Sequence, residues 1–370
     1  MTMTRFRQRL AALTLITAAV TAAGTLTPAL AATAPSMTVN AGAVNIAVQG
    51  PDNSLLFYWA NTGSSTWNVS TVAGAGTTFS APSMTVSGNT IYLAVQGPDN
   101  SLMFYWAVAG TPGWNVQTVV GAGSTSVSPS VVANGDTVNI AAKGPENQVL
   151  FYWAYKGQYI WHPETVAGAD SSDGVPSMTV DGNTFYIAVI RNEIESNLVV
   201  YTAVIGTGTW QSQNLGSDDA YSYQPAITAN GSNVDIAAIN QDEGQLDFYS
   251  EAAGSGNWTL QQLAGPRSVL VIPPSIAINN KTITIAAVGE QGQLCFYYAA
   301  SGTTNWHSDT VAYGLGSYAS APSLTANGTS PNIAIENSSD DLMFYWAPSV
   351  TTVWNAETLP GPSGDIGTDP

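Results

Sequence analysis

The 370-residue sequence contains one cysteine, Cys295, and two histidines, His162 and His307. A single cysteine excludes a disulfide within the chain, so the fold has to be held together by a hydrophobic core. Each histidine directly follows a tryptophan, and neither has a cysteine or a second histidine at a spacing typical of a metal site. The sequence therefore predicts no metal ion.

Charged residues make up 9% of the chain, and basic residues are the rarer kind, with 8 Lys and Arg against 25 Asp and Glu. Arg5, Arg7 and Arg9 lie at the N-terminus, so the chain beyond residue 31 keeps 5 basic residues and a formal net charge of 5 − 25 = −20. Without a basic stripe to neutralise phosphates, nucleic acid and anionic membrane surfaces are excluded as partners.

Apolar runs long enough to span a bilayer are also missing. The longest run, Leu10–Gly24, follows the three arginines and precedes Ala29 and Ala31, small residues at the positions that a signal peptidase requires. We interpret residues 1–31 as a signal peptide that is cleaved after Ala31. This predicts a secreted, extracellular protein without membrane insertion; the alternative is an uncleaved N-terminal anchor.

The chain is rich in repeats. The decapeptide GPDNSLLFYW begins at Gly50 and returns with one substitution, as GPDNSLMFYW, at Gly97. The longer unit recurs seven times with a period of 47–49 residues, and three of its positions are invariant. They are Trp67, Trp114, Trp161, Trp210, Trp258, Trp306 and Trp354; Tyr58, Tyr105, Tyr152, Tyr201, Tyr249, Tyr297 and Tyr345; and Ala47, Ala94, Ala141, Ala188, Ala237, Ala286 and Ala334. We interpret the large rings as packing residues between units and the alanines as positions where units crowd together.

Each unit contains four short strand patterns separated by Gly, Pro, Asn and Asp turns, and no segment beyond residue 31 has a helical period. A four-stranded repeat of about 48 residues is typical of a propeller blade. We predict an all-β, seven-bladed β-propeller of four-stranded antiparallel blades over residues 32–360, followed by a flexible tail over 361–370. The predicted blades are approximately 34–80, 81–128, 129–175, 176–223, 224–272, 273–321 and 322–360.

Motifs of the common enzyme classes are absent from the units. The sequence has no Gly-rich phosphate loop and no G-x-S-x-G motif. Carboxylates that could form a glycosidase pair, such as Asp218, Asp219, Asp340 and Asp341, fall in predicted turns, where solvated acids are common. We therefore predict that the protein is not an enzyme and has no catalytic residues.

One variable column favours ligand binding. The residue after the invariant Tyr is, in chain order, Trp59, Trp106, Trp153, Thr202, Ser250, Tyr298 and Trp346. A position that accepts both Trp and Ser is not a tight core position, and the following hairpin brings it beside the polar residue after the invariant Trp. The fullest aromatic–polar pairs are Trp59/Asn68, Trp106/Asn115, Trp153/His162 and Trp346/Asn355. Such a pair suits a sugar, whose apolar face stacks on the ring; alternatively, these Trp residues only cover the blade edges.

The unit GPDNSLLFYWANTGSSTWNVSTVAG, Gly50 to Gly74, resembles the repeat of the PLL-like bacterial seven-bladed propeller lectins, and the likeness extends over all seven units. The resemblance implies binding of fucosylated or O-methylated glycans in pockets between blades, without a cofactor. The chain departs from that family where Phe57, Phe104 and Phe151 replace a histidine of the third strand, and where a further loop Trp is missing. It is also similar to the fungal fucose lectins, but it lacks their repeated Arg and Glu.

The sequence thus predicts a secreted, multivalent carbohydrate-binding protein with glycans as partners. The four pairs are its predicted sites, and blades 4 and 5, with Thr202 and Ser250, are predicted to be inactive. Repeated weak sites on one rigid ring raise the overall affinity through effective concentration. Two alternatives remain: a propeller-fold glycoside hydrolase or lyase, and a non-catalytic interaction scaffold at the cell surface.

Overall fold

The computed structural model describes residues 33–111, 113–192, 196–216, 221, 223–240, 245–263, 272–279, 281–289, 292–315, 320–350 and 353–361. The unit Ala31–Pro370 contains the propeller, and the other unit, Met1–Leu30, lies outside the described residues. The predicted signal peptide and the predicted tail beyond residue 361 therefore also lie outside them.

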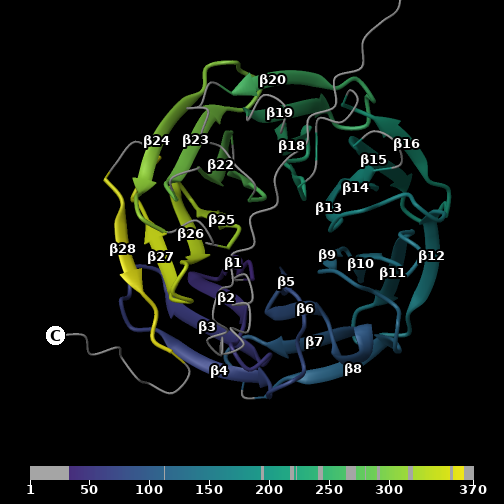
Figure 1. Cartoon of the computed structure of the whole chain (residues 1–370), viewed down its shortest axis with the longest axis horizontal. Coiled ribbons are helices and arrows are strands. Elements are labelled where there is room, and N and C mark those ends of the chain that lie inside the picture. Colours follow the sequence, from purple (N-terminus) through teal and green to yellow (C-terminus); the bar gives the residue numbers. More distant parts are fainter. Residues whose placement is uncertain are drawn as a thin grey trace, which may run out of the picture. The chain divides into compact units, whose positions relative to one another are not determined.

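Within this part of the chain 28 strands form seven four-stranded antiparallel sheets arranged in a ring (Figure 1). This confirms the predicted seven-bladed propeller. Besides the strands, one helical turn is described, η1 (Pro98–Asn100). No described helix has the length and apolar character needed to cross a membrane.

Each repeat supplies all four strands of one blade. The strands of blades 1 to 4 are β1 (Ser36–Asn40), β2 (Ala43–Gln49), β3 (Leu55–Asn61), β4 (Asn68–Ala73); β5 (Ser83–Ser87), β6 (Thr90–Gln96), β7 (Leu102–Val108), β8 (Asn115–Val120); β9 (Ser130–Asn134), β10 (Thr137–Lys143), β11 (Val149–Tyr155), β12 (His162–Ala167); and β13 (Ser177–Asp181), β14 (Thr184–Asn192), β15 (Ser196–Val204), β16 (Gln211–Asn214). The strands of blades 5 to 7 are β17 (Ala226–Ala229), β18 (Asn233–Asn240), β19 (Gln245–Ala252), β20 (Thr259–Leu263); β21 (Ser275–Asn279), β22 (Thr282–Val288), β23 (Leu294–Ala300), β24 (His307–Ala312); and β25 (Ser323–Asn327), β26 (Ser330–Glu336), β27 (Leu342–Trp346), β28 (Asn355–Thr358).

The blades are ordered from the axis outward. The first strand of each blade lies innermost and the fourth lies at the rim (Figure 1). The second strand is flanked on both edges and covered on both faces, so β2 is buried along most of its length, whereas β4 has no fully buried residue. The invariant alanines are fully buried in these second strands; Ala47, for example, pairs with Ser36 in β1 and Phe57 in β3.

The invariant tryptophans connect neighbouring blades. Trp114 of blade 2 meets Phe57 of blade 1 edge-on, with ring centroids 5.1 Å apart. The same contact joins Trp67 to Phe344, Trp161 to Phe104, Trp210 to Phe151, Trp306 to Phe248 and Trp354 to Phe296. The predicted packing role of this column between blades is confirmed.

In six of the seven blades one serine of the inner strand bonds to the next blade, and blade 5 has Ala226 at this position. Ser36 Oγ accepts a hydrogen bond from the backbone N–H of Met84 in the next blade, at 3.0 Å. Ser323 Oγ of blade 7 accepts one from Met37 N–H of blade 1 at 2.9 Å, which closes the ring. Equivalent contacts start from Ser83, Ser130, Ser177 and Ser275. Since the seventh sheet contains only β25 to β28, blades 7 and 1 meet by packing of their faces and not by a shared strand.

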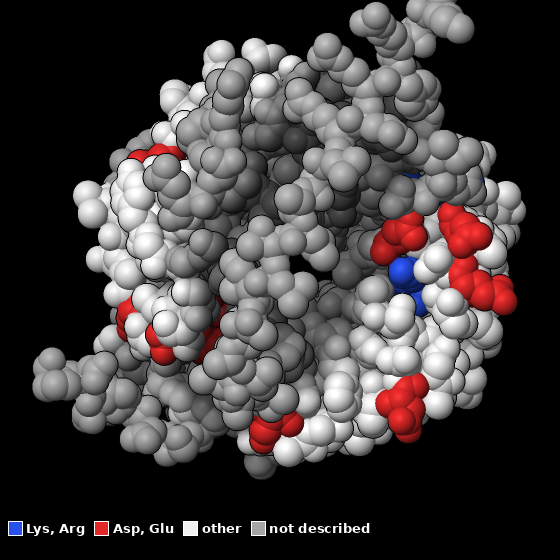
Figure 2. All heavy atoms as spheres, in the orientation of Figure 1, with Lys and Arg blue, Asp and Glu red and all other residues white. Residues whose placement is uncertain are grey.

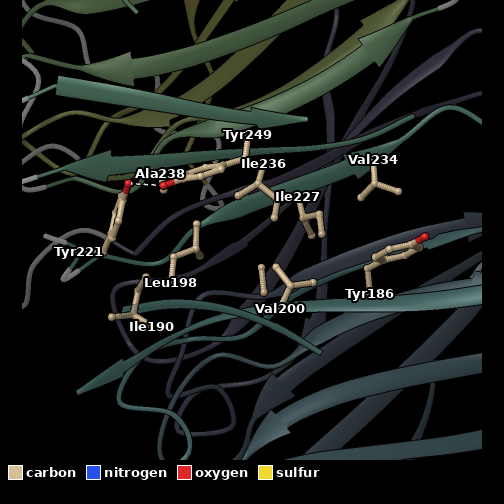
Figure 3. Close-up of a cluster of buried hydrophobic side chains, with 11 residues drawn as sticks. Tyr186, Ile190, Leu198, Val200, Tyr221, Ile227, Val234, Ile236, Ala238 and Tyr249 are labelled. Carbon is tan, nitrogen blue, oxygen red and sulfur yellow. Dashed lines mark hydrogen bonds between the residues drawn. The ribbon is translucent and has the colours of Figure 1, made fainter. Parts of the chain in front are cut away.

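The interface between blades 4 and 5 contains polar groups inside an apolar cluster (Figure 3). The Tyr221 hydroxyl donates a hydrogen bond to Asp247 and lies 2.7 Å from the Tyr249 hydroxyl. Burial, reinforced by these hydrogen bonds, raises the pKa of Tyr221 above its usual range. The network holds Tyr221, which lies between β16 and β17, against blade 5, which is a structural role.

Cys295 is buried beside Tyr297 between blades 5 and 6, as its place in the strand pattern predicts. Burial raises the pKa of its thiol, so the reactive thiolate is disfavoured. We expect a polar maleimide to label the native protein slowly and the denatured protein at once. Mass spectrometry of timed samples measures this, and rapid labelling of the native protein would contradict it.

Candidate functional site

The paired strands place each predicted polar residue directly opposite its tryptophan. Trp59 near the end of β3 is the Cα partner of Asn68 at the start of β4. The other three pairs have the same register: Trp106 with Asn115, Trp153 with His162, and Trp346 with Asn355. All four indoles are half-buried, as expected for the end of a strand that faces both a neighbouring blade and solvent.

The polar partners do not all lie in the same way. Asn68 Nδ2 donates to the Trp59 carbonyl oxygen at 3.4 Å, and Asn115 and Asn355 make the same contact at 3.3 and 3.5 Å. These three amides therefore bond to the backbone of the Trp residue on the paired strand. The His162 ring instead stacks on Trp153, with centroids 4.2 Å apart and planes inclined by 22°. One face of Trp153 is therefore already covered by the protein.

A cavity of about 840 Å³ opens between blades 1 and 2, with Trp59 in its wall. Phe57 lies beside Trp59 in blade 1, and Trp114 and Ile91 form the wall from blade 2. The amide side chains of the lining are Asn40, Asn45, Asn61 and Asn89. The volume lies within the range of small-molecule sites, and aromatic walls with a few convergent polar groups are typical of them.

The length of the side chain three residues after each invariant Trp explains in part why this cavity is open. In blade 3 it is Glu164, whose carboxylate accepts from Trp153 Nε1 at 3.0 Å and from Trp210 Nε1 of blade 4 at 3.2 Å. Gln261 and Glu357 likewise accept from the invariant Trp of the following blade, Trp306 and Trp67. In blade 1 the residue is Ser70, which lines the cavity and is too short for this contact.

The sequence pairs therefore describe only part of this candidate site. Phe57, Trp114, Asn45 and Asn89 also line it, and they are not among the predicted site residues. The sequence does contain a signal for the open cavity at the position three residues after each invariant Trp. Blade 1 has a short side chain there, whereas most other blades have a long one. The residues are Ser70, Gln117, Glu164, Gln213, Gln261, Asp309 and Glu357.

Blade 5 has a carboxyl group, Asp235, at the position equivalent to Asn45 of blade 1. There Asp235 is completely buried, paired with Ser250 on β19. Burial raises the pKa of Asp235 to about 6, and the Ser250 hydroxyl lowers it in part. A carboxyl group with this environment is protonated over much of the acidic range.

The opposite end of the blades is formed by the repeated GPDN turns. Asp52 accepts a hydrogen bond from Ser54 N–H at 3.1 Å, and Asn53 adopts a left-handed backbone with φ of 60°. These are the features of a tight turn, which accounts for the motif without a ligand. Figure 2 shows one end of the ring, where acidic side chains lie at several places around the rim and basic ones cover little area.

The acids considered for catalysis do not form a described site. Asp341 accepts a hydrogen bond from Asn337 Nδ2 at 3.0 Å within the turn between β26 and β27, and Asp340 lies exposed in the same turn. Asp218 and Asp219 lie outside the described residues. Among the residues that the structure describes, no group of three or more His, Cys, Asp or Glu could hold a metal ion.

No family model matches the chain, and no curated protein sequence matches it. Solved structures do match its fold. BP39L lectin from Burkholderia pseudomallei is similar over 89% of this chain and 99% of its own, with a TM-score of 0.76 and 15% sequence identity. A fucose-recognising fungal lectin from Aleuria aurantia, described as a six-bladed β-propeller, covers 75% of this chain and 93% of its own, with a TM-score of 0.54 and 12% identity.

A prolyl endopeptidase also matches, with a TM-score of 0.57 and 12% identity over 88% of this chain and 49% of its own. The chain therefore spans about half of that enzyme. The first structural neighbours are lectins with propeller folds, and the seven-bladed ring agrees with the fold implied by the resemblance to the PLL-like lectins.

Proposed function

We propose that the protein is a lectin that binds a neutral sugar in the cavity between blades 1 and 2. The observation that carries the proposal is the half-buried indole of Trp59 in the wall of an 840 Å³ cavity with amides in its lining. The apolar face of a sugar ring would stack on Trp59, and its hydroxyls would exchange hydrogen bonds with amides of the lining such as Asn45 and Asn89. Asn68, the predicted partner of Trp59, is not part of that lining. Binding of this kind needs no catalytic group.

The composition of the cavity supports a neutral ligand. Its described lining residues carry no charge, so a sialic or uronic acid would lose hydration without gaining a cationic partner. Ile91 and Val108 offer apolar surface that would accept the methyl group of a 6-deoxy sugar. Fucose, which the Aleuria lectin recognises, is therefore the first sugar to test.

The remaining pairs extend this proposal. Trp153 with His162 and Trp346 with Asn355 stay predicted sites of the same kind, which would make the protein multivalent. Export is supported by the charged and apolar pattern of residues 1–31 and by the scarcity of charge in the rest of the chain. We propose that the secreted protein meets its glycans outside the cell.

Replacing Trp59 by alanine is the direct test. A glycan array with the protein from residue 32 onward identifies a ligand, and calorimetry then compares variants. We expect Trp59→Ala to weaken binding roughly 30-fold or more, because a central Trp of an interface typically contributes at least about 2 kcal/mol. Unchanged circular dichroism would show that the fold is intact.

Thr202→Ala is the matched control, since Thr202 holds the same register in blade 4 without an aromatic ring. It should leave affinity unchanged. Equal binding by Trp59→Ala and the parent protein would contradict the proposed site, and an array without any glycan ligand would favour an interaction scaffold. Release of sugar from a bound glycan would favour the hydrolase alternative.

A further inference from the structure

The position between blades 2 and 3 is filled by a side chain of the protein itself. Tyr159, in the segment between β11 and β12, packs on Trp106 with ring centroids 4.3 Å apart and on Phe104 at 5.4 Å. Only 9% of its surface is exposed. Burial, with the nearby Tyr92 hydroxyl as a smaller cause, raises the pKa of Tyr159 to about 12.

The groups around Tyr159 correspond one by one to the walls of the open cavity. With a constant offset of 47 residues, Trp106 corresponds to Trp59, Phe104 to Phe57, Trp161 to Trp114 and Tyr92 to Asn45. The four residues of blades 2 and 3 all belong to the apolar cluster that contains Tyr159. Tyr92 and Phe104 are fully buried in it, and Trp106 and Trp161 are partly buried. The phenol ring thus lies between blades 2 and 3 where the cavity lies between blades 1 and 2.

The backbone at Tyr159 is held in an unfavourable conformation. Its φ is 49°, in the left-handed region that bulky residues rarely adopt. The conformation is fixed by a hydrogen bond from Tyr159 N–H to the Tyr155 carbonyl and by one from Gln117 Nε2 of blade 2 to the Tyr159 carbonyl, both 3.0 Å. The same loop position in blades 4 and 5 is Gly208 and Gly256, with φ of 60° and 68°.

Blades 4 and 5 therefore have glycine where blade 3 has a tyrosine. A strained backbone that carries a large ring into an aromatic recess persists only because the surrounding contacts stabilise it. In the repeat alignment the corresponding residue of blade 2 is Pro112, which cannot supply an aromatic ring.

We infer that Tyr159 is a built-in occupant of the site between blades 2 and 3, which it closes to external ligands. The consequence for sugar binding rests on the proposed function. Trp106 and Asn115 then contribute no sugar site in the native protein. Of the two equivalent positions, the one at Trp59 is open and the one at Trp106 is closed. The Tyr159 ring also defines a binding mode. A six-membered ring packs on the Trp and on the Phe beside it, tilted against the Trp, with a hydroxyl group directed toward the register of Asn45.

Tyr159→Gly tests the inference, with Tyr159→Phe as its matched control. Glycine suits the backbone at this position and empties the recess, whereas phenylalanine keeps the ring and loses only the hydroxyl. Calorimetry with methyl α-L-fucoside should give one more site per chain for Tyr159→Gly than for the parent protein. Tyr159→Phe should keep the parent stoichiometry, and combining Tyr159→Gly with Trp106→Ala should remove the additional site.

A second measurement does not depend on sugar binding. p-Cresol, the side chain of tyrosine as a free molecule, should raise the melting temperature of Tyr159→Gly and leave that of Tyr159→Phe unchanged, because an emptied apolar recess binds a matching aromatic molecule. If the parent protein binds no sugar but p-cresol stabilises Tyr159→Gly, the proposed function fails and the occupancy stands. If p-cresol has no effect and the sugar stoichiometry does not rise, the inference is overturned.

Discussion

Replacing Trp67 by alanine is expected to lower the free energy of unfolding by about 3 kcal/mol, the lower end of the range for large aromatic residues in a core. Trp67 lies where blade 1 meets blade 7. Its ring packs edge-on against Phe344, with centroids 5.0 Å apart, and its Nε1 donates to Glu357 Oε1 at 2.7 Å. The substitution removes both contacts at the interface that closes the ring, where, as between the other blades, no strand is shared.

Denaturation in guanidinium chloride, followed by circular dichroism, measures this change. Trp67→Phe keeps an aromatic edge against Phe344 and loses the N–H donor, so it should cost less than the alanine variant. Glu357→Gln keeps an acceptor for the indole and should cost least of the three. A Trp67→Ala protein as stable as the parent would show that ring closure does not depend on this contact.

The contrast with Trp59 separates the two tryptophan columns. Trp67→Ala should lower stability, whereas Trp59→Ala should mainly lower sugar affinity, because Trp59 lines a cavity. Both indoles are half-buried, so exposure alone does not distinguish them. The difference lies in what each ring contacts: the neighbouring blade for Trp67, and the open cavity for Trp59.

Raising the pH is expected to destabilise the protein, because burial raises the pKa of the buried acids Asp235, Glu251 and Glu336. Asp235 and Glu336 have the largest shifts. Burial raises the pKa of Asp235 from 3.8 to about 6. Burial and the nearby Asp340 raise the pKa of Glu336 from 4.5 to about 8, and a hydrogen bond from the Thr33 backbone lowers it in part. Both carboxyl groups are therefore protonated in the folded protein at a pH where they are ionised in the unfolded chain.

The direction follows from linkage between folding and proton binding. Each acid has a lower pKa in the unfolded chain and a higher pKa in the folded protein. At a pH between these two values the folded state binds more protons than the unfolded state, so the free energy of unfolding falls as pH rises. The contribution is fully present below the unfolded pKa of each acid, and it is lost as pH rises through about 6 for Asp235 and about 8 for Glu336. The contribution is on the order of 3 kcal/mol for Asp235 and on the order of 5 kcal/mol for Glu336.

Melting temperatures recorded from about pH 4 to about pH 9 should therefore fall with increasing pH. The repeats provide matched replacements: Asn45 and Asn139 stand at the register of Asp235, and Gln49 and Gln96 at that of Glu336. Asp235→Asn combined with Glu336→Gln should flatten the curve. A parent protein whose stability is constant or rises over this range would contradict the prediction.

Much of the fold follows from the sequence because its causes are local or periodic. The alternation of side chains in a strand places Cys295 on the same face as Tyr297, and a short hairpin brings Trp59 opposite Asn68. The period of 47–49 residues then repeats the same blade seven times. Since a single blade leaves both faces bare, the repetition itself predicts a ring.

The open or closed state of each site was not predictable from these patterns. Whether Trp59 lines a cavity depends on Trp114 and Ile91 of the next repeat and on the short side chain of Ser70, which meet only when two blades pack face to face. Tyr159 lies in a segment without strand periodicity, so nothing local indicates that its ring turns inward onto Trp106.

The sequence by itself thus determined the strands, their register, the number of blades and the pairing of each Trp with a polar neighbour. Only the tertiary structure decided that the Trp59 site is hollow and that a phenol ring covers Trp106. The physical reason is that hydrogen-bonded register is set within one repeat, whereas a cavity is the space left between two repeats. That space depends on the volumes of side chains that lie 30 to 60 residues apart, such as Trp59 and Trp114 or Trp106 and Tyr159.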